Sequence, residues 1–272
     1  MIIDTHTHVF PDKLAPRAIG ALEAVLPEGH RAYLSGTRDE LVASMKRSGI
    51  DRSIVLPVVT APRQFESVNS FAAEINGRDS LISFGGIHPD NEDIEEKLLY
   101  IRSLGLKGIK LHPDYQKCFV DDERYIRIVA AAVRLGLTVV FHAGIDAGYP
   151  DPVHCPPDRA AAMLDTVYAL TGVEEPKIVL AHIGGNFMYD EVMAHLVGRR
   201  VYFDLAYSAD KLPAEKLISL IRRHGAERIL FATDSPWEDQ KKLVDYVKGL
   251  DLTEAEKELI LGGNAARIIG IE

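Results

Sequence analysis

The sequence has little cysteine and no excess of basic residues. Its 272 residues include two cysteines, Cys118 and Cys155, which do not form a CxxC pair. Two scattered thiols cannot build a disulfide framework, so we expect a reducing compartment. Asp and Glu outnumber Lys and Arg by 40 to 31, which gives a net charge of −9, and no basic run appears. This charge balance disfavours nucleic acid and anionic lipid as partners.

The sequence also lacks the long apolar segments of a membrane protein. No apolar stretch approaches the roughly 18 residues of a membrane span. The first residues show no charged region followed by an apolar one, so no signal peptide is expected. We therefore expect a cytoplasmic protein that binds a small molecule and not a membrane. Assembly into a homo-oligomer is left open. Apolar residues make up 47% of the chain, which is enough for a large core.

Short apolar runs alternate with longer amphipathic stretches. The stretch 122–136, for example, has apolar residues at a spacing of three to four and predicts a helix. Such helices are expected to end near Gly49, Gly105 and Gly136. Eight short apolar runs alternate with such helices, and we interpret each run as the strand of a parallel βαβ unit. Eight units predict an α/β fold closed into a distorted TIM (β/α)8 barrel. No linker divides residues 1–272, so one domain is expected. The eight runs cover residues 2–8, 52–58, 81–88, 106–112, 137–142, 177–182, 201–207 and 228–234.

Polar residues end several of these apolar runs. Barrel enzymes keep their chemistry at the C-terminal ends of the strands. Side chains alternate along a strand, so His6 and His8 face the same side. Two buried imidazoles without partners would be costly, and a metal ion removes that cost. Imidazole and carboxylate ligands suit Zn²⁺ and similar divalent ions. The polar strand-end residues are His6, His8, His88, Lys110, His112, His142, His182 and Asp234.

Other polar segments carry weaker signals. His30, His154, His195 and His224 fall in predicted loops or helices and are expected at the surface. Residues 143–160 contain four prolines and two glycines, which predicts a loop. Because this loop follows a strand, it would lie on the catalytic face and could act as a lid.

With these residues in view, the chain resembles the amidohydrolase superfamily of metal-dependent hydrolases. It is most similar to the branch that includes aminocarboxymuconate-semialdehyde decarboxylase and its relatives. The matching stretches span residues 4 to 270. They are DTHTH (4–8), GIKLHP (108–113), FHAG (141–144), AHIGGN (181–186), FATDSPW (231–237) and LGGNAARIIG (261–270).

The resemblance implies a set of site residues. The metal ligands would be His6, His8, His142 and Asp234, with Asp234 and His182 as catalytic residues. A second metal or the substrate would be bound by Lys110, His182, His112 and His88. We favour one divalent ion per chain and expect it to be Zn²⁺. The alternative is two ions bridged by a carboxylated Lys110.

Three functions remain open at this point. The first is hydrolysis of an amide, ester or lactone by a metal-activated water, which the short chain favours. The second is a metal-dependent, non-oxidative decarboxylation of a small carboxylated substrate. The third is a non-catalytic metal-binding barrel. A purely structural zinc site usually has cysteine ligands. Neither Cys118 nor Cys155 lies at a predicted strand end, which disfavours such a site.

Overall fold

The strands follow the order of the chain around a central barrel. The computed structural model describes residues 1–149 and 151–271; Pro150, inside the predicted lid segment, and Glu272 lie outside the described residues. The strands are β1 (Ile3–Thr7), β2 (Arg52–Val55), β3 (Leu81–Ser83), β4 (Gly85–Gly86), β5 (Gly108–Leu111), β6 (Thr138–Phe141), β7 (Ile178–Leu180), β8 (Tyr202–Asp204) and β9 (Ile229–Leu230).

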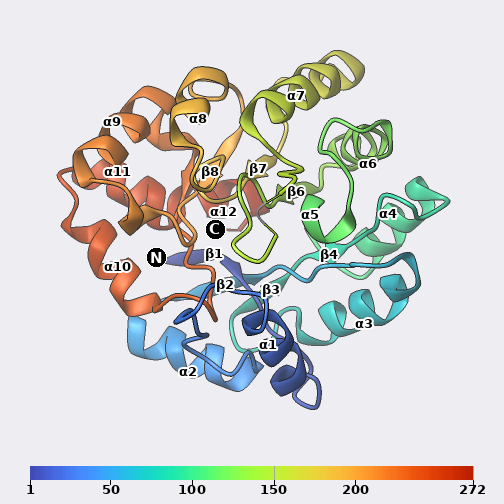
Figure 1. Cartoon of the computed structure of the whole chain (residues 1–272), viewed down its shortest axis with the longest axis horizontal. Helices are drawn as coiled ribbons and strands as arrows, with labels where there is room; N and C mark the ends of the chain where they lie inside the picture. The colour runs from blue at the N-terminus through green and yellow to red at the C-terminus, as the bar shows by residue number, and fades with distance from the viewer. Residues whose placement is uncertain (150, 272) are drawn as a thin grey trace.

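All neighbouring strands are parallel, and two links close the ring. The order is β1-β2-β3 in one sheet and β4-β5-β6-β7-β8-β9 in the other. Only Phe84 separates β3 from β4, and its N–H donates to Val55 of β2 at 2.9 Å. The second link joins β1 to the segment after β9, where Thr7 and Ser235 form a parallel bridge. With β3 and β4 as one position, eight strand positions surround the axis. This confirms the predicted (β/α)8 barrel, whose ring of strands is seen in Figure 1.

Helices cover the outside of this barrel (Figure 1). In α6, Asp122 accepts a hydrogen bond from the backbone of Arg124 at the N-terminus, and one apolar face is buried. Gly49, Gly105 and Gly136 follow helices with positive φ, as predicted. The helices are α1 (Ala15–Glu23), α2 (Arg38–Ser48), α3 (Phe65–Ile75), α4 (Ile94–Ser103), α5 (Pro113–Gln116), α6 (Glu123–Arg134), α7 (Pro157–Thr171), α8 (Tyr189–His195), α9 (Ala214–His224), α10 (Gln240–Gly249), α11 (Glu254–Glu258) and α12 (Asn264–Ile269).

Two apolar layers form the core, and they fix the direction of the polar side chains. Ile109 and Leu111 of β5 pack in the outer layer between barrel and helices. The inner layer fills the barrel with side chains such as Ile54 and Val140. Because alternate residues of a strand face opposite sides, Lys110 points into the barrel between its two outward neighbours.

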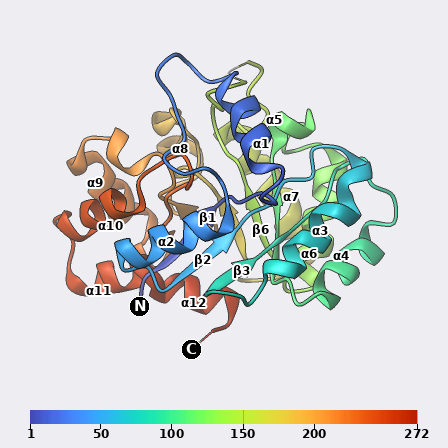
Figure 2. The same ribbon diagram turned by 90° about the horizontal axis from the view of Figure 1, so that it is seen from below.

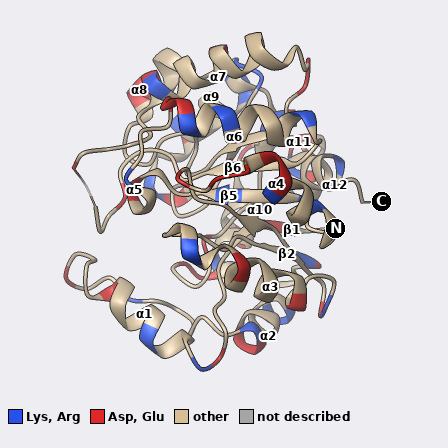
Figure 3. Ribbon diagram, turned by 90° about the vertical axis from the view of Figure 1, so that its right-hand side faces the viewer, with Lys and Arg blue, Asp and Glu red and all other residues tan. Residues whose placement is uncertain are grey.

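One end of the barrel is covered by a segment from between β1 and β2. Figure 2 shows α1 above the barrel, at the end opposite both termini. In Figure 3 basic and acidic residues intermingle over the outer helices. Within residues 1–149 and 151–271, none of the helices has the length and apolarity that crossing a membrane requires.

Candidate metal centre

His6, His8 and Asp234 converge at one end of the barrel. His6 lies in β1 and His8 just beyond it, while Asp234 follows β9 and its N–H donates to the carbonyl of His6 at 2.9 Å. Asp234 Oδ1 lies 3.5 Å from His6 Nε2 and 3.2 Å from His8 Nε2. Two ligands of one tetrahedral zinc ion, each about 2.1 Å from it, are roughly 3.4 Å apart. The spacing of these three donors therefore fits a bound divalent metal ion.

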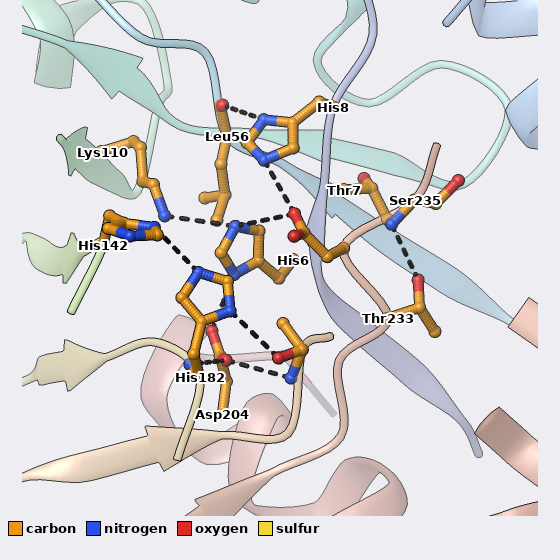
Figure 4. A network of polar contacts seen from close by, with 12 residues as sticks. His6, Thr7, His8, Leu56, Lys110, His142, His182, Asp204, Thr233 and Ser235 are labelled. Atoms are coloured by element: carbon orange, nitrogen blue, oxygen red, sulfur yellow. Dashed lines mark hydrogen bonds and ion pairs between the residues drawn. The ribbon is translucent and has the colours of Figure 1, made fainter. Parts of the chain in front are cut away.

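Hydrogen bonds fix which imidazole nitrogen faces the centre. His6 Nδ1 donates to Asp204 Oδ2 at 2.9 Å, and His8 Nδ1 donates to the carbonyl of Leu56 at 2.9 Å (Figure 4). In both rings Nε2 then carries a lone pair of the kind that binds a metal. Such outer partners normally set the tautomer and orientation of metal-binding histidines.

Asp204 belongs to this cluster and was not among the residues predicted from the sequence. It ends β8 and is fully buried, and besides His6 it accepts the backbone N–H of His182 at 2.8 Å. The available signal was an aspartate inside the apolar run 201–207.

Lys110 reaches the same centre from β5. Its Nζ lies 3.2 Å from His6 Nε2, and the side chain is almost completely buried. Burial lowers the pKa of Lys110 to about 8, although the carboxylates of Asp204 and Asp234 oppose the shift. The amine occupies the lone-pair direction of His6. A cation bound by His6 therefore requires that amine to move away.

His182 and His142 form a second pair beside this centre. His182 Nδ1 lies 3.0 Å from the carbonyl of Ala206, and His182 Nε2 lies 3.0 Å from His142 Nδ1 (Figure 4). His182 and Asp234 both have positive φ, at 60° and 66°. A left-handed backbone at non-glycine residues is uncommon and is often found at functional sites.

The other nitrogen of His142 points to a second group of donors. This group consists of His112, His142 and Asp146, whose ligand atoms lie within 4.8 Å of one another, as do those of His6, His8 and Asp234. The structure thus brings His142 close to His182. It does not place His142 within the three-residue group of the first centre, and its role as a fourth ligand stays a prediction.

The electrostatics favour neutral imidazoles and an ionised Asp234. Burial lowers the pKa of His6, His112 and His142 well below the usual range, and nearby Lys110 acts in the same direction. Burial alone would raise the pKa of Asp234, but its proximity to the imidazoles of His6 and His8 lowers it to about 2. Neutral imidazoles and a carboxylate are the protonation states that metal binding requires.

A pocket opens over these groups. It encloses about 610 Å³ of space, its mouth to solvent included. Among the described residues that line it, Arg31 is the one lysine or arginine, and it comes from the segment after α1. The lining residues are Leu22, Val25, Leu26, His30, Arg31, Tyr115, His142, Asp146, Ala147, Gly148, His182, Asn186, Tyr207, Asp234 and Trp237.

Several histidines lie elsewhere than expected. His88 is buried, accepts the backbone N–H of Asp90, and does not line the pocket. His224 was expected at the surface but is buried, because its ring stacks on Phe203 at 3.9 Å. His30 is exposed, as expected, and also lines the pocket, while the partly buried His154 lies against Asp114.

Comparison with known proteins gives a family. The family model described as Amidohydrolase matches residues 3–271, which confirms the resemblance seen in the sequence. No curated protein sequence matches the chain.

Solved structures with the same fold cover nearly the whole chain. A 5-carboxyvanillate decarboxylase from Sphingomonas paucimobilis is 17% identical, with 100% of this chain and 99% of that chain covered and a TM-score of 0.73. A 2,6-dihydroxybenzoate decarboxylase from Rhizobium is 18% identical, with 99% and 98% covered and a TM-score of 0.69. A dihydroxybenzoic acid decarboxylase from Polaromonas sp. JS666, with bound manganese and the inhibitor 2-nitroresorcinol, is 16% identical, with 99% and 96% covered and a TM-score of 0.73.

These structures correct the function expected from the sequence. The sequence favoured hydrolysis because the chain is short. The three similar structures above are decarboxylases, and this chain covers 96% or more of each of them. Chain length was therefore a poor guide, and the decarboxylase alternative is better supported.

Proposed function

The chain belongs to the amidohydrolase family, and we propose that it is a metal-dependent decarboxylase of a small carboxylated substrate. The observation that carries the proposal is the convergence of His6, His8 and Asp234 beneath a pocket with a cationic wall residue, Arg31. The shared fold of the decarboxylases described above supports it.

His6, His8 and Asp234 would hold the metal ion, with His142 as the predicted fourth ligand. Zn²⁺ is expected from the donor types, and the manganese in one similar structure makes Mn²⁺ the alternative. When bound, the ion supplies positive charge that stabilises the negative charge developing in the substrate. Its ligands are fixed in advance by Asp204 and Leu56, so little rearrangement is required of the two imidazoles.

Arg31 would recognise and orient an acidic substrate. Its guanidinium can bind a carboxylate with two parallel hydrogen bonds. In the same pocket Tyr115 and Trp237 supply aromatic surface, and Leu22 and Leu26 supply apolar surface from the segment that covers the barrel. The pocket therefore combines one anion-binding group with flat apolar walls, which suits a carboxylated aromatic ring.

Decarboxylation needs a proton as well as charge stabilisation. When the C–C bond breaks, CO₂ leaves without the bonding electron pair, and the carbon that keeps the pair takes up a proton. Asp234, with a pKa of about 2, carries no proton at neutral pH and is better suited to the ligand role. His182 lines the pocket, so we assign it the delivery of this proton.

The proposal is tested by product analysis. Protein loaded with Zn²⁺ or Mn²⁺ is incubated with a panel of carboxylated phenols and other aromatic acids, and CO₂ and the remaining product are measured. We expect CO₂ release in equal amounts with the decarboxylated product, lost on chelation and restored by metal. Absence of CO₂ from every aromatic acid tried, with metal fully loaded, would contradict the proposal.

A further inference from the structure

Tyr207 has an unusual backbone conformation in the wall of the pocket. It lies shortly after β8, lines the pocket and has a φ of 59°. For a bulky side chain this left-handed backbone is an outlier, and such outliers cluster at active sites and ligand clamps. Burial, together with the nearby carboxylates of Glu238 and Asp234, raises the pKa of Tyr207 to about 12. Tyr207 therefore presents a neutral aromatic ring to the pocket at physiological pH.

The ammonium group of Lys211 holds both the backbone and the ring of Tyr207. Lys211 Nζ donates to the carbonyl of Tyr207 at 2.7 Å and lies 3.6 Å from the centre of its ring. A cation over an aromatic face is attracted to the negative charge of that face. The described lining of the pocket includes Tyr207 but not Lys211. The cation therefore supports the ring from outside the pocket.

Lys211 is in turn held by Glu238. The Glu238 side chain is buried, and its Oε1 accepts a hydrogen bond from Lys211 Nζ at 2.6 Å. A second lysine, Lys242 of α10, pairs with Asp210 and lies 3.6 Å from Glu238 Oε2. Within the described residues, Lys242 makes no hydrogen bond or cation–ring contact with Tyr207. The two lysines thus share one ion network, and of these two it is Lys211 that contacts the pocket wall.

We propose that Tyr207 is the stacking platform for the aromatic ring of the substrate and that Lys211 is its positioning residue. The inference rests on the proposed function, because it places the ring of a carboxylated aromatic acid. A positive charge on one side of a ring draws the π electrons toward itself, so the opposite side becomes less negative. Because ring faces are otherwise negative and repel one another, that side is a better partner for the electron-rich ring of an aromatic anion.

Binding of two matched acids tests this contact. Benzoate and cyclohexanecarboxylate carry the same charge and differ in the aromatic ring. Trp237, the single tryptophan of the chain, lines the pocket, so quenching of its fluorescence gives Kd for each acid on Zn²⁺-loaded protein. We expect Tyr207→Leu and Lys211→Met each to weaken benzoate binding by about 3- to 10-fold, the range of one aromatic contact. The Kd of cyclohexanecarboxylate should stay close to the wild-type value.

The double variant Tyr207→Leu/Lys211→Met separates positioning from a general disturbance of the pocket. Because Lys211 acts through Tyr207, Lys211→Met should weaken benzoate binding no further once Tyr207 is replaced. Lys242→Met is the matched control and should bind both acids like the wild type. Circular dichroism checks the fold of each variant, and Lys211→Met tests the contact by itself if Tyr207→Leu does not fold.

Three outcomes would overturn the inference. The first is a wild-type Kd for benzoate in Lys211→Met, and the second is an additive loss in the double variant. The third is an equal loss for the two acids, which would show that the aromatic ring is not what the contact recognises. Each of these leaves the proposed function intact, because CO₂ release is measured separately. A wild type that releases CO₂ from an aromatic acid but binds benzoate no better than cyclohexanecarboxylate would also contradict the inference alone.

Discussion

Asp204 Oδ2 lies 2.9 Å from His6 Nδ1, and its other oxygen accepts the backbone N–H of His182 at 2.8 Å. One buried carboxylate at the end of β8 thus connects the strand that carries the first histidines with the turn that carries the proposed proton donor. Through His6 it fixes the metal-binding nitrogen, and through the backbone it helps hold His182 in its left-handed conformation.

Removing this charge should weaken metal binding. In Asp204→Asn the amide can present a donor to His6 Nδ1, which disfavours the metal-binding tautomer. We expect zinc affinity to fall by about 10- to 100-fold, as is typical when the partner of a metal-binding histidine is changed. Competition with a coloured chelator measures the affinity, and Asp210→Asn serves as control. An affinity equal to that of the wild type would show that Asp204 does not orient His6.

His182→Asn should separate chemistry from metal binding. Asparagine can keep a hydrogen bond but cannot transfer a proton, so we expect kcat to fall by about 10²- to 10⁴-fold. Metal content should equal that of the wild type. If metal content falls together with activity, His182 is a ligand and the proton must come from another group.

Arg31→Gln should weaken substrate binding more than turnover. The side chain is exposed at the pocket mouth, so its interaction with a carboxylate is partly screened. We expect KM for an acidic substrate to rise by about tenfold, with metal content unchanged. Arg17→Gln, on the exposed face of α1, is the control. Equal KM values in the two variants would place the substrate carboxylate elsewhere.

The metal-free protein should lose stability below neutral pH, in part through His224. Burial lowers the pKa of this histidine to about 4, so the unfolded state binds a proton at higher pH than the folded state. Stability is therefore highest above pH 6.5 and falls as the pH drops toward 4. From pH 7 to pH 5 this one group should account for about 2 kcal/mol. Denaturation of His224→Gln and wild type at both pH values measures the difference; equal losses would exclude the effect.

Much of the fold could be predicted from the sequence because its signals are local. Buried strands such as 138–141 stand out as apolar runs, and helix ends are marked by glycines such as Gly136. The positions of His6, His8 and Asp234 followed from the rule that polar strand ends meet at one end of a barrel. The structure brings these three together, as that rule predicts.

The remaining features depend on contacts between distant segments. His142 and Asp146 are four residues apart, yet their approach to Asp114 depends on how the loop after β6 packs on the start of α5. Arg31 reaches the pocket only because the segment around α1 crosses the barrel mouth. His224 shows the converse, since a polar residue at a helix end is buried by stacking on Phe203.

Metal-dependent CO₂ release by the variant His6→Ala/His8→Ala tests the central claim most directly. Both imidazoles point at Asp234, so the double variant should lose the metal ion while the barrel, closed by backbone hydrogen bonds, stays folded by circular dichroism. With a carboxyl-labelled aromatic acid that the wild type decarboxylates, we predict that labelled CO₂ falls to the background of the metal-free wild type. CO₂ release at the wild-type rate from the folded double variant would contradict the account.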